Sequence, residues 1–389
     1  MVNKPKKRYF LDYGILIPYI ALSIIGVVMV YSATAYRLIN AGANEFSGGI
    51  KQAAFFIVGL ILIYIIYHMK IDFLRNKRVI NISLAAIIGM LMLTLIIGTA
   101  LGGAKGWITV AGVQIQPVEF LKIIVIWYLS NVVASRQAEI QRSFTQSFFG
   151  PMIAIGISVF LLLLQPDTGG AAIVVLLTLV MLLASGISYW YGIAVTGGGV
   201  ALSVIAIEFV TLIGKYFLPE YIVNRFLVFR NPFIDPYASG MQMIQSYYAM
   251  FNGGLFGRGL GNSIQKKGFL PVAESDFIFS IIIEELGLIA AIIILCILLF
   301  LILRILAVGI SATSTFNSMM CIGISAMMLI QTFINVGGIT GLIPMTGVTF
   351  PFISQGGSSF IALSIGVGLA LNIRADELRK KHQRHIEAL

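Results

Sequence analysis

The carboxylate of Asp276 closes a polar segment that includes Glu274 and Ser275, and an apolar run begins immediately after it. A carboxylate at such a boundary can act as a general base that takes a proton from a hydroxyl. Asp276 can also serve as the N-cap of the following helix, because Asp is favoured there and complements the helix dipole. The two roles are compatible, and Glu274 is either a partner of Asp276 or a solvated loop charge.

Glu119 and Lys122 open another apolar run, in the sequence Gln116-Pro117-Val118-Glu119-Phe120-Leu121-Lys122. Their i,i+3 spacing places both side chains on one face of a helix. Charges within a membrane span are costly unless they are paired or face a cavity. We therefore expect either an internal ion pair that borders a polar cavity or a pair that lies in the membrane interface.

Three further carboxylates lie near the ends of apolar runs. Asp167 follows Gln165-Pro166, which favours a turn residue in a short loop. Glu284 and Glu285 fall two turns after Asp276 on the same predicted helix. They indicate either a polar cavity or a partly hydrated end of the helix.

Basic residues and glycines are concentrated in the segment 213–276. The basic side chains could hold a pyrophosphate group or attract anionic lipid headgroups; they are Arg225, Arg230, Arg258, Lys266 and Lys267. The glycine-rich stretch 252–261 lacks the flanking strand and the Lys-Ser/Thr ending of a nucleotide-binding loop. It indicates tight turns or a close approach of two backbones.

Ser358 belongs to a Gly-Gly-Ser-Ser stretch at the start of the last apolar run, where small residues favour close helix packing. A polar floor for a substrate cavity is the alternative interpretation. No metal site is predicted, because the histidines, His68, His382 and His385, fall in predicted cytoplasmic segments. The two cysteines, Cys296 and Cys321, lie in apolar runs and are interpreted as buried hydrophobic residues.

The elements that must position these side chains are membrane helices. Apolar residues make up 58% of the 389 residues and charged residues only 11%, whereas soluble domains have roughly 25% charged residues. About 20 apolar residues span a bilayer, and we predict an all-α integral membrane protein of about ten transmembrane helices. The predicted spans are 11–33, 50–68, 79–99, 117–135, 148–164, 169–186, 189–212, 277–303, 315–337 and 350–373.

The distribution of Lys and Arg predicts the topology. With the N-terminus in the cytoplasm, the inner segments carry 16 basic residues and the short outer loops carry 3. This asymmetry follows the positive-inside rule and places both termini in the cytoplasm. Residues 1–389 then form a single membrane domain, within which 213–276 is one long extracellular loop. The same rule explains the net charge of +10, so no nucleic-acid partner is expected.

Four segments together resemble the SEDS family (shape, elongation, division, sporulation), the FtsW/RodA/SpoVE group of bacterial cell-wall polymerases. They are Gln116–Lys122, Gln165–Ala171, Arg225–Gly287 and Gly341–Ser359. The resemblance implies that the chain joins lipid II units into glycan strands at the outer face of the cytoplasmic membrane. It favours a division-type member, which would act at the division septum with a class B penicillin-binding protein and other division proteins.

The resemblance also implies roles for individual residues. The family's essential aspartate matches Asp276, its buried Glu/Lys pair matches Glu119 and Lys122, its loop arginine matches Arg225, and its Gln-Ser pair matches Gln245 and Ser246. We add Lys266 and Ser358 to the predicted substrate-binding residues. The chain departs from the family's Leu-Pro-Glu-x-His-Thr-Asp pattern at three positions, where it has Val272, Glu274 and Ser275, and the corresponding roles are not transferred.

The chemistry implied is an inverting glycosyl transfer from undecaprenyl-pyrophosphate-linked glycan to lipid II. Asp276 would act as the base, and Arg225 with neighbouring basic residues, or a divalent cation, would stabilise the departing pyrophosphate; no other cofactor is evident. Two alternatives stay open. A lipid II flippase would use Glu119, Lys122, Asp167 and Glu285 along a polar route across the membrane. The other alternative is a non-catalytic division scaffold, against which the dense polar content of the outer loop argues.

Overall fold

The computed structural model describes residues 7–101, 104–110, 112–140, 144–187, 190–194, 197–199, 208–209, 216, 220–237 and 240–387. Its helices are η1 (Lys7–Phe10), α1 (Tyr13–Asn40), α2 (Ser47–His68), α3 (Ile71–Leu74), α4 (Lys77–Ile97), α5 (Pro117–Ile140), α6 (Phe144–Leu164), α7 (Thr168–Ala184), α9 (Glu220–Arg230), η3 (Pro232–Ile234), α10 (Met241–Gly253), α11 (Ile278–Ser311), α12 (Thr315–Ile339) and α13 (Gly357–Glu387). The strands are β1 (Thr99–Leu101), β2 (Ala104–Val110) and β3 (Val113–Ile115).

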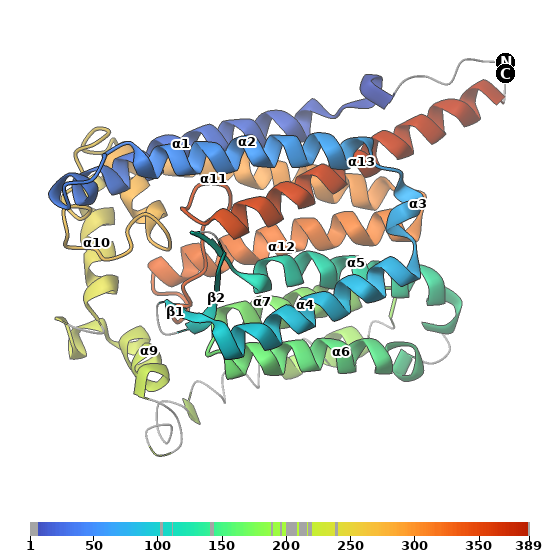
Figure 1. Ribbon diagram of the computed structural model, residues 1–389, viewed down its shortest axis with the longest axis horizontal. Helices are drawn as coiled ribbons and strands as arrows, with labels where there is room; N and C mark the ends of the chain where they lie inside the picture. Colours follow the sequence, from blue (N-terminus) through green and yellow to red (C-terminus); the bar gives the residue numbers. More distant parts are fainter. Residues whose placement is uncertain are drawn as a thin grey trace.

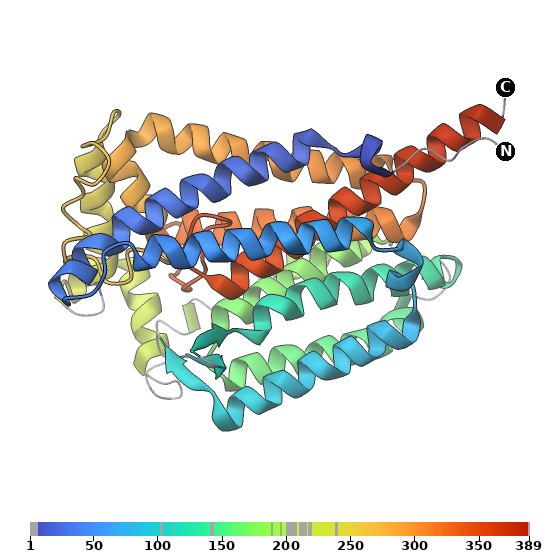
Figure 2. The same cartoon turned by 45° about the horizontal axis from the view of Figure 1, so that its top comes forward.

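The long helices run side by side as one bundle (Figures 1 and 2). Within the described residues, eight helices are long and apolar enough to cross a bilayer, and α7 is a shorter apolar helix. The prediction of a helical, multi-pass membrane protein is confirmed. Nine of the predicted spans coincide with helices of the structure, while the predicted span 189–212 lies largely outside the described residues.

The first and last described elements, η1 and the end of α13, lie at one end of the bundle, and α9, α10 and the strands β1 and β2 lie toward the opposite end (Figure 1). The basic residues counted as cytoplasmic, such as Arg75 and Arg304, belong to helix ends on the side of the termini. Arg304 forms an ion pair with Asp12 of 2.8 Å at that end. The predicted topology requires the two termini to lie at the same end; the placement of α9 and α10 outside the membrane stays a prediction.

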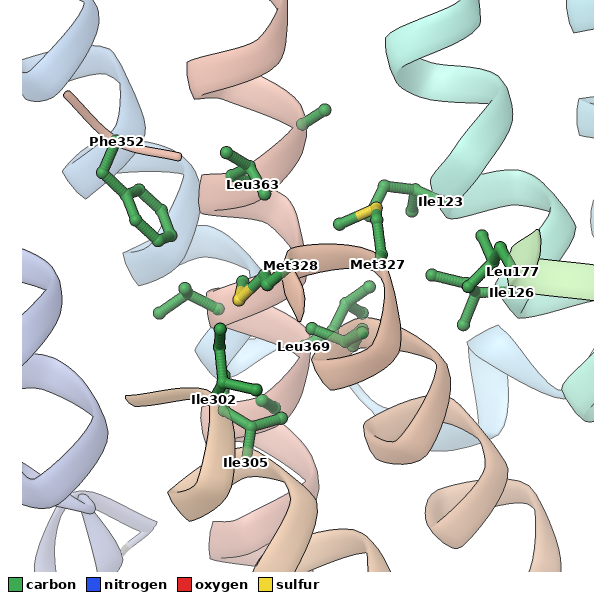
Figure 3. Packing of buried hydrophobic residues seen from close by; sticks show 14 of the residues in the cluster. Ile123, Ile126, Leu177, Ile302, Ile305, Met327, Met328, Phe352, Leu363 and Leu369 are labelled. Carbon is green, nitrogen blue, oxygen red and sulfur yellow. The ribbon is translucent and has the colours of Figure 1, made fainter. Parts of the chain in front are cut away.

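The core of the bundle is built around α12 and α13. In the apolar part of α12 72% of the residues are buried and in that of α13 83%, against 22% in α2, which faces the lipid. Figure 3 shows side chains from five helices meeting there. They are Ile123 and Ile126 of α5, Leu177 of α7, Ile302 and Ile305 of α11, Met327 and Met328 of α12, and Leu363 and Leu369 of α13.

A small antiparallel sheet occupies the outer loop between α4 and α5, which the sequence analysis treated as a plain loop. In it β2 pairs with β1 and with β3, and Thr109 lies opposite Gln114. Hydrogen bonds attach the sheet and the residue after it to the bundle: the Lys105 amide donates to the Gln165 carbonyl at 3.0 Å, Ser358 Oγ donates to the Gln114 carbonyl at 3.3 Å, and the Gln116 amide donates to Ser358 Oγ at 3.0 Å. The all-α description therefore holds for the membrane helices and not for this outer loop.

The helix α11 is broken at Gly287, whose φ of 85° and ψ of 166° are not helical. The backbone amides and carbonyls that lose their helical partners at the break form hydrogen bonds with residues 254–259 instead. The amides of Arg258 and Gly259 donate to the carbonyls of Glu284 and Glu285, each at 2.9 Å, and the amides of Leu288 and Ile289 donate to the carbonyls of Gly254 and Leu255, at 2.9 and 3.2 Å. Unpaired backbone groups at this depth would be costly, so the segment 254–259 completes the helix.

The close backbone approach predicted for the glycine-rich stretch is found here. A Cβ atom on Gly257 would lie 2.3 Å from the Glu285 carbonyl oxygen, and one on Gly287 would lie 2.4 Å from the Leu255 carbonyl oxygen. Both positions also have positive φ, which favours glycine. We call residues 253–261 the glycine-rich hairpin.

Candidate functional site

A large cavity opens at the outer end of the bundle. Its volume is about 1360 Å³, and it is lined by residues of α1, α2, α5, α7, α9, α10, the sheet and the loops before α11 and α13. The ionisable residues among the described lining residues are the acids Glu119, Asp167, Glu274 and Asp276 and the bases Arg37 and Lys51. Side chains from distant parts of the sequence therefore meet in one polar chamber.

Asp276 lies in the turn before α11, and its carboxylate faces Gly347: a Cβ on Gly347 would lie 3.3 Å from Asp276 Oδ2. The cap position of α11 belongs to Phe277, whose side chain makes no capping hydrogen bond. The N-cap interpretation of Asp276 is thus not what the structure shows. Asp276 lies instead on the cavity wall.

Two loops are fastened together around Asp276. Asn335 of α12 is buried, and its side-chain amide donates to the carbonyls of both Asp276, at 2.8 Å, and Val348, at 2.7 Å. Ser354 Oγ donates to the Ser275 carbonyl at 2.5 Å, and the Gln355 amide donates to the Glu274 carbonyl at 2.9 Å. These bonds hold the backbone of Asp276 against the loop that precedes α13.

That second loop is anchored in the core by Phe352. Its ring is buried and packs edge-on against Tyr19 of α1, with ring centroids 5.3 Å apart (Figure 3 shows Phe352 beside the core). The residue has a φ of 64°, which is uncommon outside glycine. Gly26 of α1 allows the approach, because a Cβ there would meet the Phe352 carbonyl oxygen at 2.5 Å. Burial of the ring thus stabilises a strained backbone next to the site.

Glu119 and Lys122 form an ion pair of 2.8 Å, in which the lysine side chain is 1% exposed and the glutamate side chain 11%. Glu119 faces the cavity. Lys122 Nζ also donates to Gln331 Oε1 at 3.4 Å, and Gln331 Nε2 donates to Ser359 Oγ at 3.0 Å. We call Glu119 and Lys122 the cavity pair, since one partner lines the cavity and the other joins it to α12 and α13.

Asp167 caps α7 by accepting a hydrogen bond of 2.8 Å from the Gly170 amide. It also lines the cavity. Burial raises the pKa of its carboxyl above the usual range; the Gly170 hydrogen bond opposes this rise, and the charge of nearby Glu119 adds to it. The turn interpretation of Asp167 is confirmed, but the residue faces the chamber as well.

The cationic side chains on the cavity wall are not those that the sequence analysis proposed. Arg37 of α1 pairs with Glu274 at 2.6 Å, and Lys51 of α2 also lines the cavity. No motif in the sequence marked these two residues: Arg37 follows the predicted span 11–33, and Lys51 lies at the start of the predicted span 50–68. Glu274, one of the three departures from the family pattern, has a partner in Arg37.

Lys266 is not brought to the cavity. Its ammonium is buried, 2.6 Å from Glu285 Oε1 and 2.8 Å from Ser32 Oγ. Ser263 donates its hydroxyl to Glu284 at 2.5 Å, and Ser32 donates to Glu285 at 2.7 and 2.8 Å. We call Ser32, Ser263, Lys266, Glu284 and Glu285 the α11 cluster. The predicted substrate contact of Lys266 has no support from this geometry.

The other predicted substrate-binding residues are placed as follows. Ser246 of α10 is buried and forms hydrogen bonds with Ser280 Oγ at 2.8 Å and with the Ile339 carbonyl at 3.2 Å. Gln245 is half-buried and is not among the described cavity-lining residues. The same helix contributes Gln242 and Met243 to the cavity. Ser358 bonds to the backbone of Gln114 and Gln116. Arg225 lies in α9, but its side chain falls outside the described residues.

The sequence from residue 14 to residue 379 matches the family model of FtsW, RodA and SpoVE, described as cell cycle proteins. The chain belongs to this family. Similar curated proteins include the probable peptidoglycan glycosyltransferases FtsW of Lactococcus lactis, with 45% identity covering 96% of this chain and 95% of the relative, and of Bacillus subtilis, with 36% identity covering 96% and 92%. The stage V sporulation protein E of Bacillus subtilis is 35% identical, covering 93% of this chain and 96% of the relative.

Solved structures share the fold of this family member. A chain from a study of the structural coordination of polymerisation and crosslinking by a peptidoglycan synthase complex superimposes with a TM-score of 0.73 at 24% identity, covering 94% of this chain and 98% of the other. The crystal structure of the rod shape determining protein RodA of Thermus thermophilus gives a TM-score of 0.66 at 23% identity, covering 94% and 97%.

Proposed function

We propose that this protein is a peptidoglycan glycosyltransferase that joins lipid II disaccharide units into glycan strands during cell division. The observation that carries the proposal is the outer cavity with Asp276 on its wall. A volume of about 1360 Å³ exceeds the 300–1,000 Å³ that is common for sites of small molecules. It suits two glycolipid headgroups, a growing chain and a lipid II acceptor, at the level of the membrane surface.

In the proposed reaction, a sugar hydroxyl of lipid II attacks the anomeric carbon of the lipid-linked glycan. The new carbon–oxygen bond forms as the bond to the pyrophosphate oxygen breaks, with inversion at the anomeric carbon. The carboxylate of Asp276 takes the hydroxyl proton. The bonds from Asn335 and Ser354 hold the turn that bears this carboxylate, and base catalysis depends on such positioning.

The departing pyrophosphate needs positive charge, because the electron pair of the broken bond stays on its oxygen. Arg37 and Lys51 supply it on the described part of the cavity wall. The ion pair with Glu274 fixes the direction of the Arg37 guanidinium, which can bind phosphate oxygens with two parallel hydrogen bonds. We add these two residues to the predicted pyrophosphate site, beside Arg225. A contribution from a divalent cation stays a prediction.

The proposed function also implies a protein partner and a cellular location. A class B penicillin-binding protein would crosslink the strands that this enzyme makes, and a structural relative belongs to a peptidoglycan synthase complex. Relatives named FtsW over nearly the whole chain support a role at the division septum.

The test is polymerisation of lipid II by the purified protein together with its class B penicillin-binding protein. Asp276→Asn keeps the size of the side chain but removes the proton acceptor, so glycan synthesis should fall by on the order of 10²-fold or more at unchanged thermal stability. Asp276→Glu displaces the charge and should also be badly impaired. The matched control is Asp72→Asn in α3, an exposed aspartate near the end that bears the termini, which should polymerise normally.

Normal polymerisation by folded Asp276→Asn would remove Asp276 as the base. Absence of glycan product from the wild-type protein under conditions that support a relative would favour the flippase or scaffold alternatives.

A further inference from the structure

The glycine-rich hairpin lies beside α11, and its depth in the membrane follows from the length of that helix. Arg304, which is paired with Asp12, marks the boundary of α11 on the side of the termini, and Leu288, the first residue after the break, precedes it by 16 residues. At about 1.5 Å per residue this distance is roughly 24 Å, less than the roughly 30 Å of the hydrocarbon core. Leu288 and Ile289 therefore lie inside the hydrocarbon, toward its outer boundary.

The hairpin reaches the same level, because its backbone is bonded to these residues. The carbonyls of Gly254 and Leu255 accept hydrogen bonds from the amides of Leu288 and Ile289. At the end of α10, Gly253 also contacts α11, since a Cβ there would meet the Ile283 carbonyl oxygen at 2.0 Å. The hairpin is thus not a loop that stands clear of the membrane in water.

Large apolar side chains of this region point outward. Phe251 is 84% exposed, Phe256 83% and Leu255 56%. On α11, Leu288, at 42%, and Ile292, at 50%, are exposed as well, and the Leu288 amide is bonded to the Gly254 carbonyl of the hairpin. Exposed apolar side chains of this kind mark surfaces that contact other molecules, and for a helix long and apolar enough to cross a bilayer that surrounding is lipid.

We propose that Phe251, Leu255 and Phe256 are inserted among the acyl chains of the outer leaflet. The backbone of the hairpin tolerates this position because its carbonyls and amides pair with the break in α11, as burial in hydrocarbon requires. Exposed Arg258, two residues after Phe256, can extend its long side chain to the phosphate layer. Part of the predicted extracellular loop 213–276 is therefore a membrane-immersed hairpin.

The proposal is tested by spin labels in the full-length protein in liposomes of phosphatidylcholine and phosphatidylglycerol. Cys321, which is buried, is first replaced by Ala. One protein keeps Cys296 of α11 as the lipid reference, because this cysteine is exposed and not buried as the sequence predicted. The other proteins carry Cys296→Ala together with one new cysteine, at Phe256, Phe251 or Tyr237. Tyr237→Cys is the aqueous reference, because Tyr237 is 91% exposed in the turn after η3. Collisions with oxygen and with water-soluble NiEDDA are compared for each label.

Labels at 256 and 251 should collide more with oxygen than with NiEDDA, as at 296, while the order reverses at 237. A preference for NiEDDA at both 256 and 251 would overturn the proposal. Low accessibility to both reagents at both positions would also overturn it, since it would mean that protein covers the patch. Polymerisation activity is not part of the readout, so the outcome is independent of the proposed function.

Discussion

The cavity pair and the α11 cluster both bury a lysine beside a glutamate, but they connect different parts of the chain. Glu119 and Lys122 are three residues apart on one helix, and the glutamate is partly exposed to the cavity. Lys266 and Glu285 are 19 residues apart, and their side chains are only 5% and 0% exposed. The first pair arranges charge on a polar wall, whereas the second fastens a loop to a broken helix.

Residue types alone therefore do not assign a role to a buried ion pair in this protein. A lysine with a glutamate in a membrane protein can mark a substrate site, and the cavity pair fits that description. In the α11 cluster the same chemistry ties the segment after the hairpin to Glu284 and Glu285, which directly precede the break at Gly287. The position of each pair relative to the cavity separates the two roles.

The largest effect is expected from Lys266→Met. It leaves the Glu285 carboxylate fully buried without its cation, which should lower the free energy of unfolding by about 3–5 kcal/mol. The measurement is the thermal midpoint of the purified protein in detergent. The neighbouring exposed Lys267→Met is the matched control and should change stability by less than about 0.5 kcal/mol. Equal midpoints for the two variants would show that the α11 cluster has no structural role.

A somewhat smaller loss is expected from Gly287→Ala. A Cβ at this position meets three backbone atoms of the hairpin within 2.5 Å, and alanine would have to adopt a φ of 85°. The strain should cost about 2–3 kcal/mol. Gly89→Ala in α4 is the control, because no atom lies within 4 Å of its added Cβ, and it should stabilise the protein by about 0.5–1 kcal/mol. Loss of stability in both variants would mean that the break is not the cause.

Glu119→Gln should lower the activity more than the stability, in contrast to the variants of the α11 cluster and its break. The cost in stability should be only about 1–3 kcal/mol, since Lys122 keeps Gln331 and the cavity is polar. Polymerisation per folded molecule should fall by on the order of 10–100-fold, because a charge on the substrate wall is lost. The charge-swapped double variant Glu119→Lys with Lys122→Glu should recover part of the stability. Unchanged stability and activity in Glu119→Gln would assign the pair to the interface only.

The smallest effect is expected when both charges of the α11 cluster are removed. Lys266→Met with Glu285→Leu should differ from the wild type by about 1 kcal/mol or less, because an apolar pair can replace a buried ion pair. Its polymerisation activity per folded molecule should stay close to normal. Glu119→Leu with Lys122→Met should instead stay inactive even where it folds. A double variant of the α11 cluster that folds well but is inactive would break the distinction between the two pairs.

Several features of this arrangement could be predicted from sequence. Nine of the spans predicted from hydropathy coincide with helices of the structure. The predicted span 315–337, for example, is close to the observed helix Thr315–Ile339. The spacing of Glu119 and Lys122 is local, so their proximity follows from helix geometry alone. The glycines of the hairpin indicated a close backbone approach because few other residues permit one.

Other features depend on contacts that no local pattern encodes. Glu285 could not be assigned to Lys266, because the break at Gly287 and the return of the loop bring them together. Arg37 and Lys51 reach the cavity only through the packing of α1 and α2 at its edge. The sheet was missed because β1 and β3 have three residues each, too few to show an alternating pattern. The last span was predicted to begin at 350, but the strained turn at Phe352 delays α13 to Gly357.

The pairing between the hairpin and α11 also restricts how this protein can change length during evolution. Surface loops usually accept insertions and deletions readily. One residue added between Gly254 and Gly259 would shift two carbonyls and two amides out of register with the break. Length variation among related chains should therefore be excluded from residues 254–259 and gather at exposed turns such as the one at Tyr237.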